Sequence, residues 1–253
     1  MSLLLLKVVL APAFVVLASL VGRRYGVRVS GVVGGLPVIA GPILLVLALE
    51  HGRAFASSAA VGTLLGIVAL IAFVVAYVAA SRRLGWPAAL LAGWSAFLVG
   101  VALLREVHTG ALAGLALAAA TCAGALVLMP HPRPFAPPPR APRRDLLFRA
   151  VCAALPVIAV TEAARALGPH LSGLLAAFPI ITPVLAAFTH AQQGPEAALR
   201  ILRGMTAGFF AYALFCFVVA VSVRGAGLAL AFVAATAVAL AAQAIAIAIA
   251  RAA

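Results

Sequence analysis

The chain has 253 residues, of which 66% are hydrophobic and only 9% are charged, and its formal net charge is +13. So few charges cannot cover a water-soluble domain, which excludes that class, and the mean hydropathy of +1.23 is typical of helical membrane proteins. The basic residues stand singly or in small clusters between apolar runs, as topology signals do, so we expect membrane lipid and no nucleic acid as a partner.

Apolar segments recur along the whole chain at the length that a helix needs to cross a bilayer, roughly 20 residues. They predict an all-α polytopic membrane protein with about nine spans. The segment Pro130–Asp145 is rich in proline and arginine and predicts a semi-rigid linker, because its prolines preclude a regular helix. We expect repeat 1 over residues 1–104, a connecting span and linker over 105–145, and repeat 2 over 146–253. The predicted spans are approximately Leu3–Val21, Val29–Leu49, Ala54–Ala80, Trp86–Leu104, Gly110–Met129, Leu146–Ala166, Leu171–His190, Ile201–Ser222 and Gly227–Ala250.

The basic residues also predict the orientation of the chain. Thirteen of the 18 lysines and arginines fall on one side of the predicted spans, and five fall on the other. Because cytoplasmic loops carry the excess of Lys and Arg, we expect the N-terminus outside, and the linker and C-terminus in the cytoplasm. The composition, rich in alanine and arginine with one lysine, is typical of a GC-rich bacterial genome. We therefore expect the inner (plasma) membrane of a bacterium.

Two proline-containing segments indicate that the chain repeats itself. Ser30–Pro42 reads SGVVGGLPVIAGP and Ser172–Pro183 reads SGLLAAFPIITP, which gives an offset of 142 residues. The offset holds without a gap from residues 23–85 onto 165–227. The repeat unit has four spans, and one unpaired span lies between the copies. Equivalent spans are therefore five crossings apart, so the second copy enters the membrane from the opposite side. The loops at equivalent positions differ in their arginine content as this inversion requires. The sequence therefore predicts an inverted repeat. The matches that support it are Arg23/Arg165, Gly26/Gly168, Ser30/Ser172, Gly31/Gly173, Pro37/Pro179, Gly52/Gly194, Gly62/Gly204, Gly66/Gly208, Phe73/Phe215, Arg82/Arg224 and Gly85/Gly227.

The repeated prolines fall inside apolar spans, where they remove backbone donors and interrupt a helix. In hydrocarbon the freed carbonyl groups need a partner, which another helix, a hydroxyl group, water or a substrate supplies. Inverted repeats with discontinuous helices are typical of secondary transporters, whereas a kink that only shapes helix packing explains the same prolines. On the first interpretation, the substrate or ion pathway contains Ser30, Gly31, Pro37, Pro42, Ser172, Gly173, Pro179, Thr182 and Pro183.

Ionisable residues near the spans are the candidates for coupling or gating. Glu162 lies inside the sixth predicted span, three residues before Arg165, where it either couples protons, binds substrate or forms an interfacial salt bridge. Glu50 and His190 lie at corresponding ends of the second and seventh spans, where the sequence fits both a gate and a solvated helix end. None of these residues has metal-ligand spacing, and we expect no catalytic residue, no metal and no cofactor.

Glycines at an interval of four residues occur at aligned positions of the two copies. Gly62 and Gly66 lie in the third predicted span, and Gly204 and Gly208 lie in the eighth. This small-residue pattern lets helix backbones approach closely. It predicts that the third and eighth spans pack closely.

The run from His170 to Phe215 combines short motifs in a set order. These are a glycine, a Phe-Pro pair, a histidine near the span end, a segment with Gly, Glu, Ala and Arg, and a glycine-bearing helix. The pattern resembles the GlpM-like family of small four-span bacterial inner-membrane proteins. The resemblance implies a fused pair of an ancestor able to assemble as an inverted dimer, and it implies no particular activity. The residues that carry it are Gly173, Phe178, Pro179, His190, Gly194, Glu196, Ala197, Arg200 and Gly204, whereas the first copy has Leu36, Ala48 and Ala54 in place of Phe178, His190 and Glu196.

The predicted architecture favours a transporter or permease that works by alternating access on a small or anionic solute, with proton coupling through Glu162 as one option. A flippase for a lipid-linked headgroup, a narrow ion channel and a non-catalytic subunit of an envelope-polymer machine are the alternatives. A homo-oligomer is compatible with each of them. An intramembrane enzyme is disfavoured, because the chain has no paired aspartates and no His-Glu-x-x-His motif.

Overall fold

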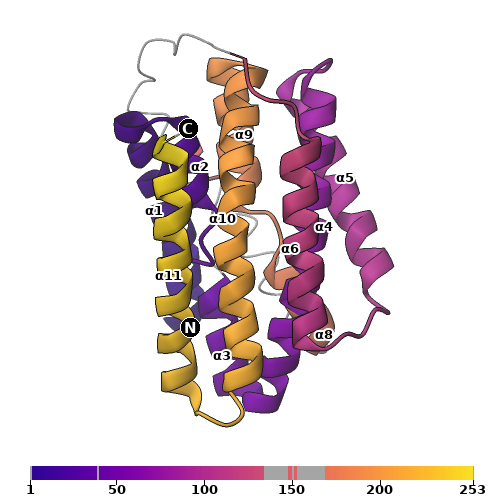
Figure 1. Ribbon diagram of the computed structural model, residues 1–253, viewed down its shortest axis with the longest axis vertical. Helices are drawn as coiled ribbons and strands as arrows, with labels where there is room; N and C mark the ends of the chain where they lie inside the picture. The colour runs from indigo at the N-terminus through magenta and orange to yellow at the C-terminus, as the bar shows by residue number, and fades with distance from the viewer. Residues whose placement is uncertain (1, 39, 134–147, 150, 153–168, 253) are drawn as a thin grey trace.

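The computed structural model describes residues 2–38, 40–133, 148–149, 151–152 and 169–252, and within them every regular element is an α-helix (Figure 1). The predicted sixth span, Leu146–Ala166, lies almost wholly outside the described residues. The helices are α1 (Ser2–Tyr25), α2 (Val27–Gly34), α3 (Ala40–His51), α4 (Arg53–Ser81), α5 (Trp86–Leu104), α6 (Ala111–Leu128), α8 (Pro169–Ala176), α9 (Ile181–Gln193), α10 (Pro195–Ser222) and α11 (Leu228–Ala252).

Six segments of the described chain are long and apolar enough to cross a membrane. They are α4, α5, α6, α10, α11 and the segment His170–Gln193, which contains α8 and α9. The prediction of an all-helical protein with several helices of membrane-spanning length is confirmed at this level. The count of nine spans stays a prediction.

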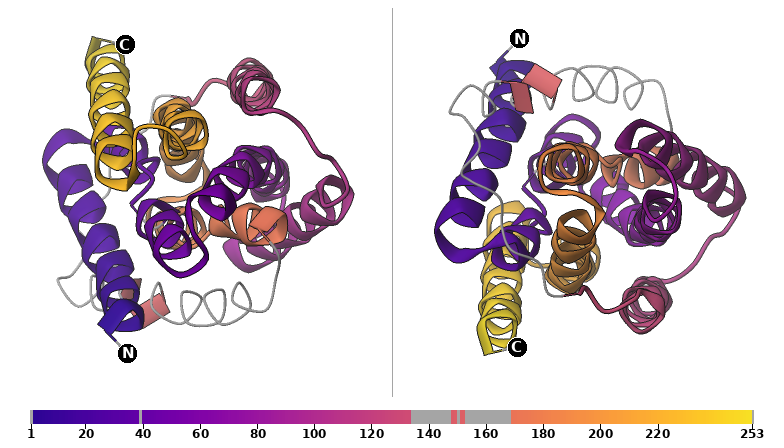
Figure 2. Two further views of the ribbon diagram at one scale, coloured as in Figure 1. Left: turned by 90° about the horizontal axis from the view of Figure 1, so that it is seen from below. Right: turned by 90° about the horizontal axis from the view of Figure 1, so that it is seen from above.

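The long helices divide into a buried centre and an exposed periphery. In α4, α10 and His170–Gln193, 67–78% of the most apolar window is buried inside the protein, against 17–22% in α5, α6 and α11. Figure 2 shows α5, α6 and α11 at the outside of the bundle in both end-on views. Their exposed side chains are large and apolar, for example Leu98, Val127 and Leu230. These surfaces have the composition of helix faces that contact lipid.

Two of the predicted spans are interrupted. The first consists of α2 and α3, separated by residues 35–39, and the second consists of α8 and α9, separated by residues 177–180. Pro37 and Pro179 lie in the interruptions, where proline removes a backbone donor and disfavours helix in the preceding residue. Pro42 and Pro183 do not lie in the interruptions. Each is the third residue of the helix that follows, α3 or α9. Because there is no preceding turn for the proline ring to clash with, these two prolines lie in the first turn of a helix without breaking it.

The interruption lets each span change its packing partner halfway. α2 packs on α10, whereas α3 packs on α4; in the other span, α8 packs on α4 and α9 packs on α10. The two spans run in opposite directions, since α2 and α9 lie at one end of the bundle and α3 and α8 towards the other (Figure 1). Each span therefore contacts one long central helix with its first half and the other with its second half.

Glycines make the closest of these contacts possible. A Cβ atom on Gly31 would overlap the carbonyl oxygen of Ile201 in α10, and a Cβ atom on Gly173 would overlap the carbonyl oxygen of Ala59 in α4. The two contacts are equivalent, because Gly173 and Ile201 lie 142 residues after Gly31 and Ala59. In each, helix backbones meet without an intervening side chain, as the small-residue pattern allows.

The predicted GxxxG pairs occupy the same two crossings. α4 and α10 do contact each other, but the glycines of α4 face α8 and those of α10 face α2, so the close packing is with the interrupted spans. Sequence spacing shows that a helix has a small-residue face, and it does not show which helix that face meets. The glycine and carbonyl contacts are Gly62 with His170, Gly66 with Leu174, Gly204 with Arg28 and Gly208 with Val32.

The central helices α4 and α10 also begin in the same way. Gly52 precedes α4 with φ 87°, and Gly194 precedes α10 with φ 85°. This left-handed conformation carries almost no penalty for glycine and is unfavourable for residues with a Cβ atom. It turns the chain sharply between α3 and α4 and, at the equivalent position, between α9 and α10.

We expect Gly173→Ala to destabilise the protein by about 1–3 kcal/mol, because the added methyl group overpacks the crossing of α8 and α4. Gly124→Ala in α6 is the matched control, since a Cβ atom there meets nothing within 4 Å. The measurement is the melting temperature of the detergent-solubilised protein, monitored by the loss of its monodisperse peak in size-exclusion chromatography after heating. Equal melting temperatures for the two variants would show that this crossing is loosely packed.

Candidate functional site

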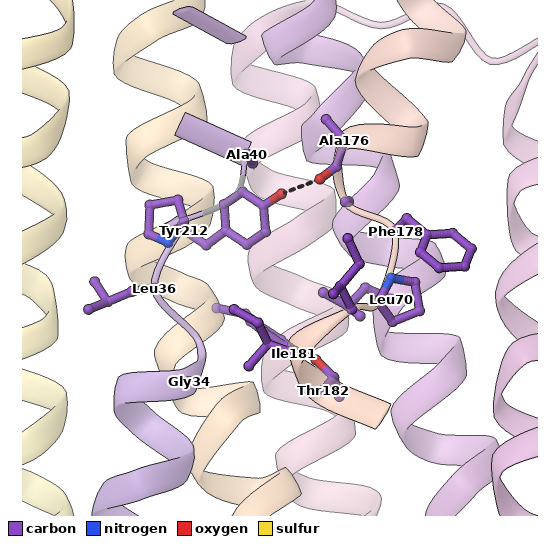
Figure 3. Close-up of a pocket in the computed structure, with 14 residues that line it drawn as sticks. Gly34, Leu36, Ala40, Leu70, Ala176, Phe178, Ile181, Thr182 and Tyr212 are labelled. Atoms are coloured by element: carbon purple, nitrogen blue, oxygen red, sulfur yellow. Dashed lines mark hydrogen bonds between the residues drawn. The ribbon is translucent and has the colours of Figure 1, made fainter. Parts of the chain in front are cut away.

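A partly open pocket lies where the two interruptions meet, and its empty space of about 370 Å³ includes the volume at its opening (Figure 3). Both interrupted spans contribute to its wall, and α4 and α10 complete it. Most of the lining forms pairs of positions that are 142 residues apart, so the two copies contribute equivalent surfaces. These pairs are Gly34/Ala176, Leu36/Phe178, Pro37/Pro179, Ala40/Thr182 and Leu70/Tyr212.

The polar side chains of the pocket all come from the second copy. The lining contains no charged residue, and its two hydroxyl groups belong to Thr182 and Tyr212, whose equivalents Ala40 and Leu70 are apolar. The Tyr212 hydroxyl donates a 3.4 Å hydrogen bond to the carbonyl oxygen of Ala176 at the end of α8 (Figure 3). Positions related by the 142-residue offset thus line the pocket together and differ in side-chain chemistry.

Backbone carbonyl groups next to the interruptions have partners. The carbonyl oxygen of Leu174 accepts from the N–H of Ala177 at 3.3 Å, and that of Leu175 accepts from the N–H of Phe178 at 2.9 Å. In the first span, the N–H of Leu36 donates to Val33 at 3.1 Å. The C-terminal ends of α2 and α8 are therefore capped within the protein, as a helix end inside a membrane requires.

The predicted pathway residues fall into two groups. Pro37, Pro179 and Thr182 line the pocket. The others lie in α2 and α8 or in the first turns of α3 and α9, outside the lining: Ser30, Gly31, Pro42, Ser172, Gly173 and Pro183. Ser30, for example, donates a 2.6 Å hydrogen bond to the carbonyl oxygen of Ala18 in α1, so this hydroxyl group joins two helices.

Two of the predicted gating residues, Glu50 and His190, lie outside the pocket lining. His190, near the end of α9, is buried, and its Nδ1 atom lies 3.2 Å from the hydroxyl oxygen of Tyr77 in α4. Glu50 is exposed at the end of α3. The structure therefore does not bring Glu50 and His190 together. Glu162 and Arg165 lie outside the described residues.

Sequence reasoning missed Gln243, which lies in the middle of α11. Its side chain is 3% exposed, and its amide nitrogen donates a hydrogen bond to the carbonyl oxygen of Val32, close to the end of α2. Its amide oxygen has no partner among the described residues. The sequence feature that could have predicted this contact is a single amide side chain in an apolar span. Such a side chain in hydrocarbon favours a hydrogen bond to another helix.

Arg203 in α10 caps the end of α6. Its Nη1 atom donates to the carbonyl oxygens of Leu126 at 2.9 Å and Met129 at 2.7 Å. Nearby, the backbone N–H of Arg133 donates to Glu196 at 3.0 Å. A guanidinium group is well suited to this role, because it carries several donors and a positive charge that complements a helix C-terminus. The first residues after α6 are thereby attached to the second copy.

No group of three or more His, Cys, Asp or Glu side chains able to hold a metal ion occurs in the described part of the chain. Comparison with protein-family models, with curated protein sequences and with solved structures finds no match for this chain. The functional argument therefore rests on the geometry of the pocket and of the interrupted spans.

We expect Arg203→Ala to lower the stability of the protein by about 1–3 kcal/mol, because it leaves the carbonyl groups at the end of α6 without donors. Arg224→Ala is the control, since Arg224 is exposed between α10 and α11. Thermal unfolding in detergent compares the two variants. A melting temperature for Arg203→Ala equal to that of Arg224→Ala would contradict the capping role.

Proposed function

We propose that this chain is a multi-pass membrane protein that moves a small solute across the membrane by alternating access. The observation that carries the proposal is the pocket, which lies where two interrupted, oppositely directed spans meet and is lined by equivalent positions of both. Discontinuous helices that meet at a midplane site are typical of secondary transporters. Because the pocket is small, the proposed solute is small as well, either neutral or anionic.

The proposal includes an inverted repeat, with four spans in residues 1–104 and four in residues 146–253. Three observations support it. The glycine and carbonyl contacts of Gly31 and Gly173 are related by the 142-residue offset, the φ angles of Gly52 and Gly194 differ by only 2° (87° and 85°), and the interrupted spans run in opposite directions. The resemblance to GlpM-like proteins, with descent from an inverted dimer, stays a prediction.

An inverted repeat suggests how access would alternate. If each copy can adopt the conformation of the other at a similar free energy, the protein has two states of similar stability. Exchange of the two conformations between the copies closes the pocket to one side of the membrane and opens it to the other. The close crossings of α2 with α10 and of α8 with α4 favour two units that move as rigid bodies, since closely packed interfaces do not deform continuously. The flexible points are then the interruptions at residues 35–39 and 177–180.

We propose an orientation with the N-terminus outside and the C-terminus in the cytoplasm of a bacterial cell, in the inner membrane. The clustering of basic residues supports it. The end of the bundle at which α2 and α10 begin and α4 and α6 end carries Arg28, Arg83, Arg133, Arg200 and Arg203, and the C-terminus lies at the same end (Figure 1). Proton coupling through Glu162 is a further part of the proposal, with the buried contact of His190 and Tyr77 closing the cytoplasmic end.

We expect Leu36→Trp to reduce solute flux at least about tenfold, because the indole ring fills the pocket, whereas Leu91→Trp on the exposed face of α5 leaves the flux unchanged. The measurement is uptake into proteoliposomes, screened over small solutes under an imposed pH gradient. Pro179→Ala and Glu162→Gln are measured beside them, and proton coupling through Glu162 predicts that Glu162→Gln abolishes the pH-driven component. Full flux in Leu36→Trp would remove the pocket from the pathway.

A single cysteine tests the alternation itself. We expect Phe178→Cys, made in a protein without Cys122, Cys152 and Cys216, to react with a membrane-impermeant thiol reagent from both sides of the membrane. The transported solute should change the two labelling rates in opposite directions, because it shifts the population between two states. Rates that remain high from both sides and ignore the solute would indicate a channel.

A further inference from the structure

We infer that the pocket binds a small anion, or the anionic group of a small solute, at the N-terminus of α9. The donors are the Thr182 hydroxyl group and the backbone N–H groups of Ile181 and Thr182. The inference names the substrate class of the pocket and rests on the proposed function only in taking this pocket as the solute site.

The N-terminus of α9 presents donors that the protein does not use. α9 has 13 residues and begins at Ile181, next to the interruption. The N–H groups of Ile181 and Thr182 donate to no described residue, and Pro183 has no N–H group at all. The first N–H groups of a helix have no partner within it, and together with the helix dipole they favour a negative charge.

The Thr182 hydroxyl group is the second and independent observation. The side chain is 3% exposed and lines the pocket, yet its hydroxyl group makes no hydrogen bond to the described part of the chain. Two buried threonines in the central helices donate to the carbonyl oxygen four residues earlier, Thr63 to Ala59 and Thr206 to Leu202, both at 2.9 Å. For Thr182 the residue four positions earlier, Phe178, lies in the interruption and not in a helix.

The position of the site favours a negative charge on the ligand. No carboxylate lines the pocket, so a cation would find no counter-charge there. Donors at a helix N-terminus, beside the Thr182 hydroxyl group, fit a ligand that accepts hydrogen bonds and carries negative charge.

The site is single, although the pocket is built from two equivalent halves. At the N-terminus of α3, the N–H of Gly41 donates to the carbonyl oxygen of Pro37 at 2.8 Å. Ala40, the equivalent of Thr182, has no hydroxyl group. The first copy therefore lacks the hydroxyl donor, and we assign the anion to the second copy. One anion is expected to bind per chain.

The test is binding of small anions to the purified full-length protein in detergent. Isothermal titration calorimetry compares sodium chloride, nitrate, formate and acetate with neutral acetamide and with the amine cation methylammonium. We expect at least one anion to bind with a stoichiometry of one, and acetamide and methylammonium to bind at least about tenfold more weakly, because a hydrogen bond to a charged group is the stronger kind. Absence of anion binding, or equal binding of acetamide or methylammonium, would overturn the inference.

Three threonine variants locate the site. Thr182→Val removes the hydroxyl group at nearly constant volume and should weaken anion binding about tenfold or more. Thr182→Ser keeps a hydroxyl group and should stay within about threefold of the unsubstituted protein. Thr189→Val is the control, because Thr189 lies in the same helix, is equally buried and does not line the pocket. Unchanged binding in Thr182→Val, or an equal loss in Thr189→Val, would remove Thr182 from the site.

Flux measurements on the same samples separate this inference from the proposed function. Anion binding that depends on Thr182, without uptake of that anion into proteoliposomes, would support the site and contradict transport. Uptake of a neutral solute that Leu36→Trp blocks, without anion binding, would support transport and overturn the anion site.

Discussion

The structure depends on one constraint, which is that an interrupted helix in hydrocarbon must satisfy every backbone group that the interruption frees. Residues 35–39 and 177–180 free such groups in the centre of the bundle, and neighbouring segments supply partners. The Tyr212 hydroxyl group bonds to Ala176, and the Gln243 amide bonds to Val32. The N–H groups of Ile181 and Thr182 at the start of α9 have no partner among the described residues. Because these donors lie beside a pocket, they are the groups on which the proposed anion site depends.

The two copies agree in backbone and differ in side chains at the pocket. Their glycine crossings and helix starts coincide under one offset, because a contact between two backbones tolerates no added Cβ atom in either copy. The lining is not under that constraint. Thr182 and Tyr212 stand where the first copy has Ala40 and Leu70. The proposed repeat therefore keeps its backbone contacts, while the lining residues at equivalent positions differ in chemistry.

Composition was enough to predict the class of the fold, and the repeated prolines marked the positions of both interruptions. The sequence did not decide between an interruption and a kink, since Pro12 lies inside the continuous helix α1. They did not predict which helices meet. The face containing Gly62 and Gly66 was visible in the sequence, but its partner α8 was not, because small-residue spacing carries no information about the opposite helix. The sequence pattern predicts that Pro42 interrupts a helix, but the structure places it in a first turn, where proline is compatible with a helix. The pattern identifies Thr182 as a candidate pathway residue and does not distinguish Gln243 from the rest of its apolar span.

The exchange of partners at each interruption has a consequence for how the chain is made. α2 emerges early in synthesis, yet the helix it packs on, α10, begins at Pro195, long after α2 has entered the membrane. Until then the face around Gly31 has no backbone to meet, and lipid or another chain has to cover it. Each half therefore packs against helices of the other half, and neither completes its packing alone. Two separately expressed halves are expected to associate through these contacts. A truncated first half exposes the unpaired face of α2, which favours association with other chains.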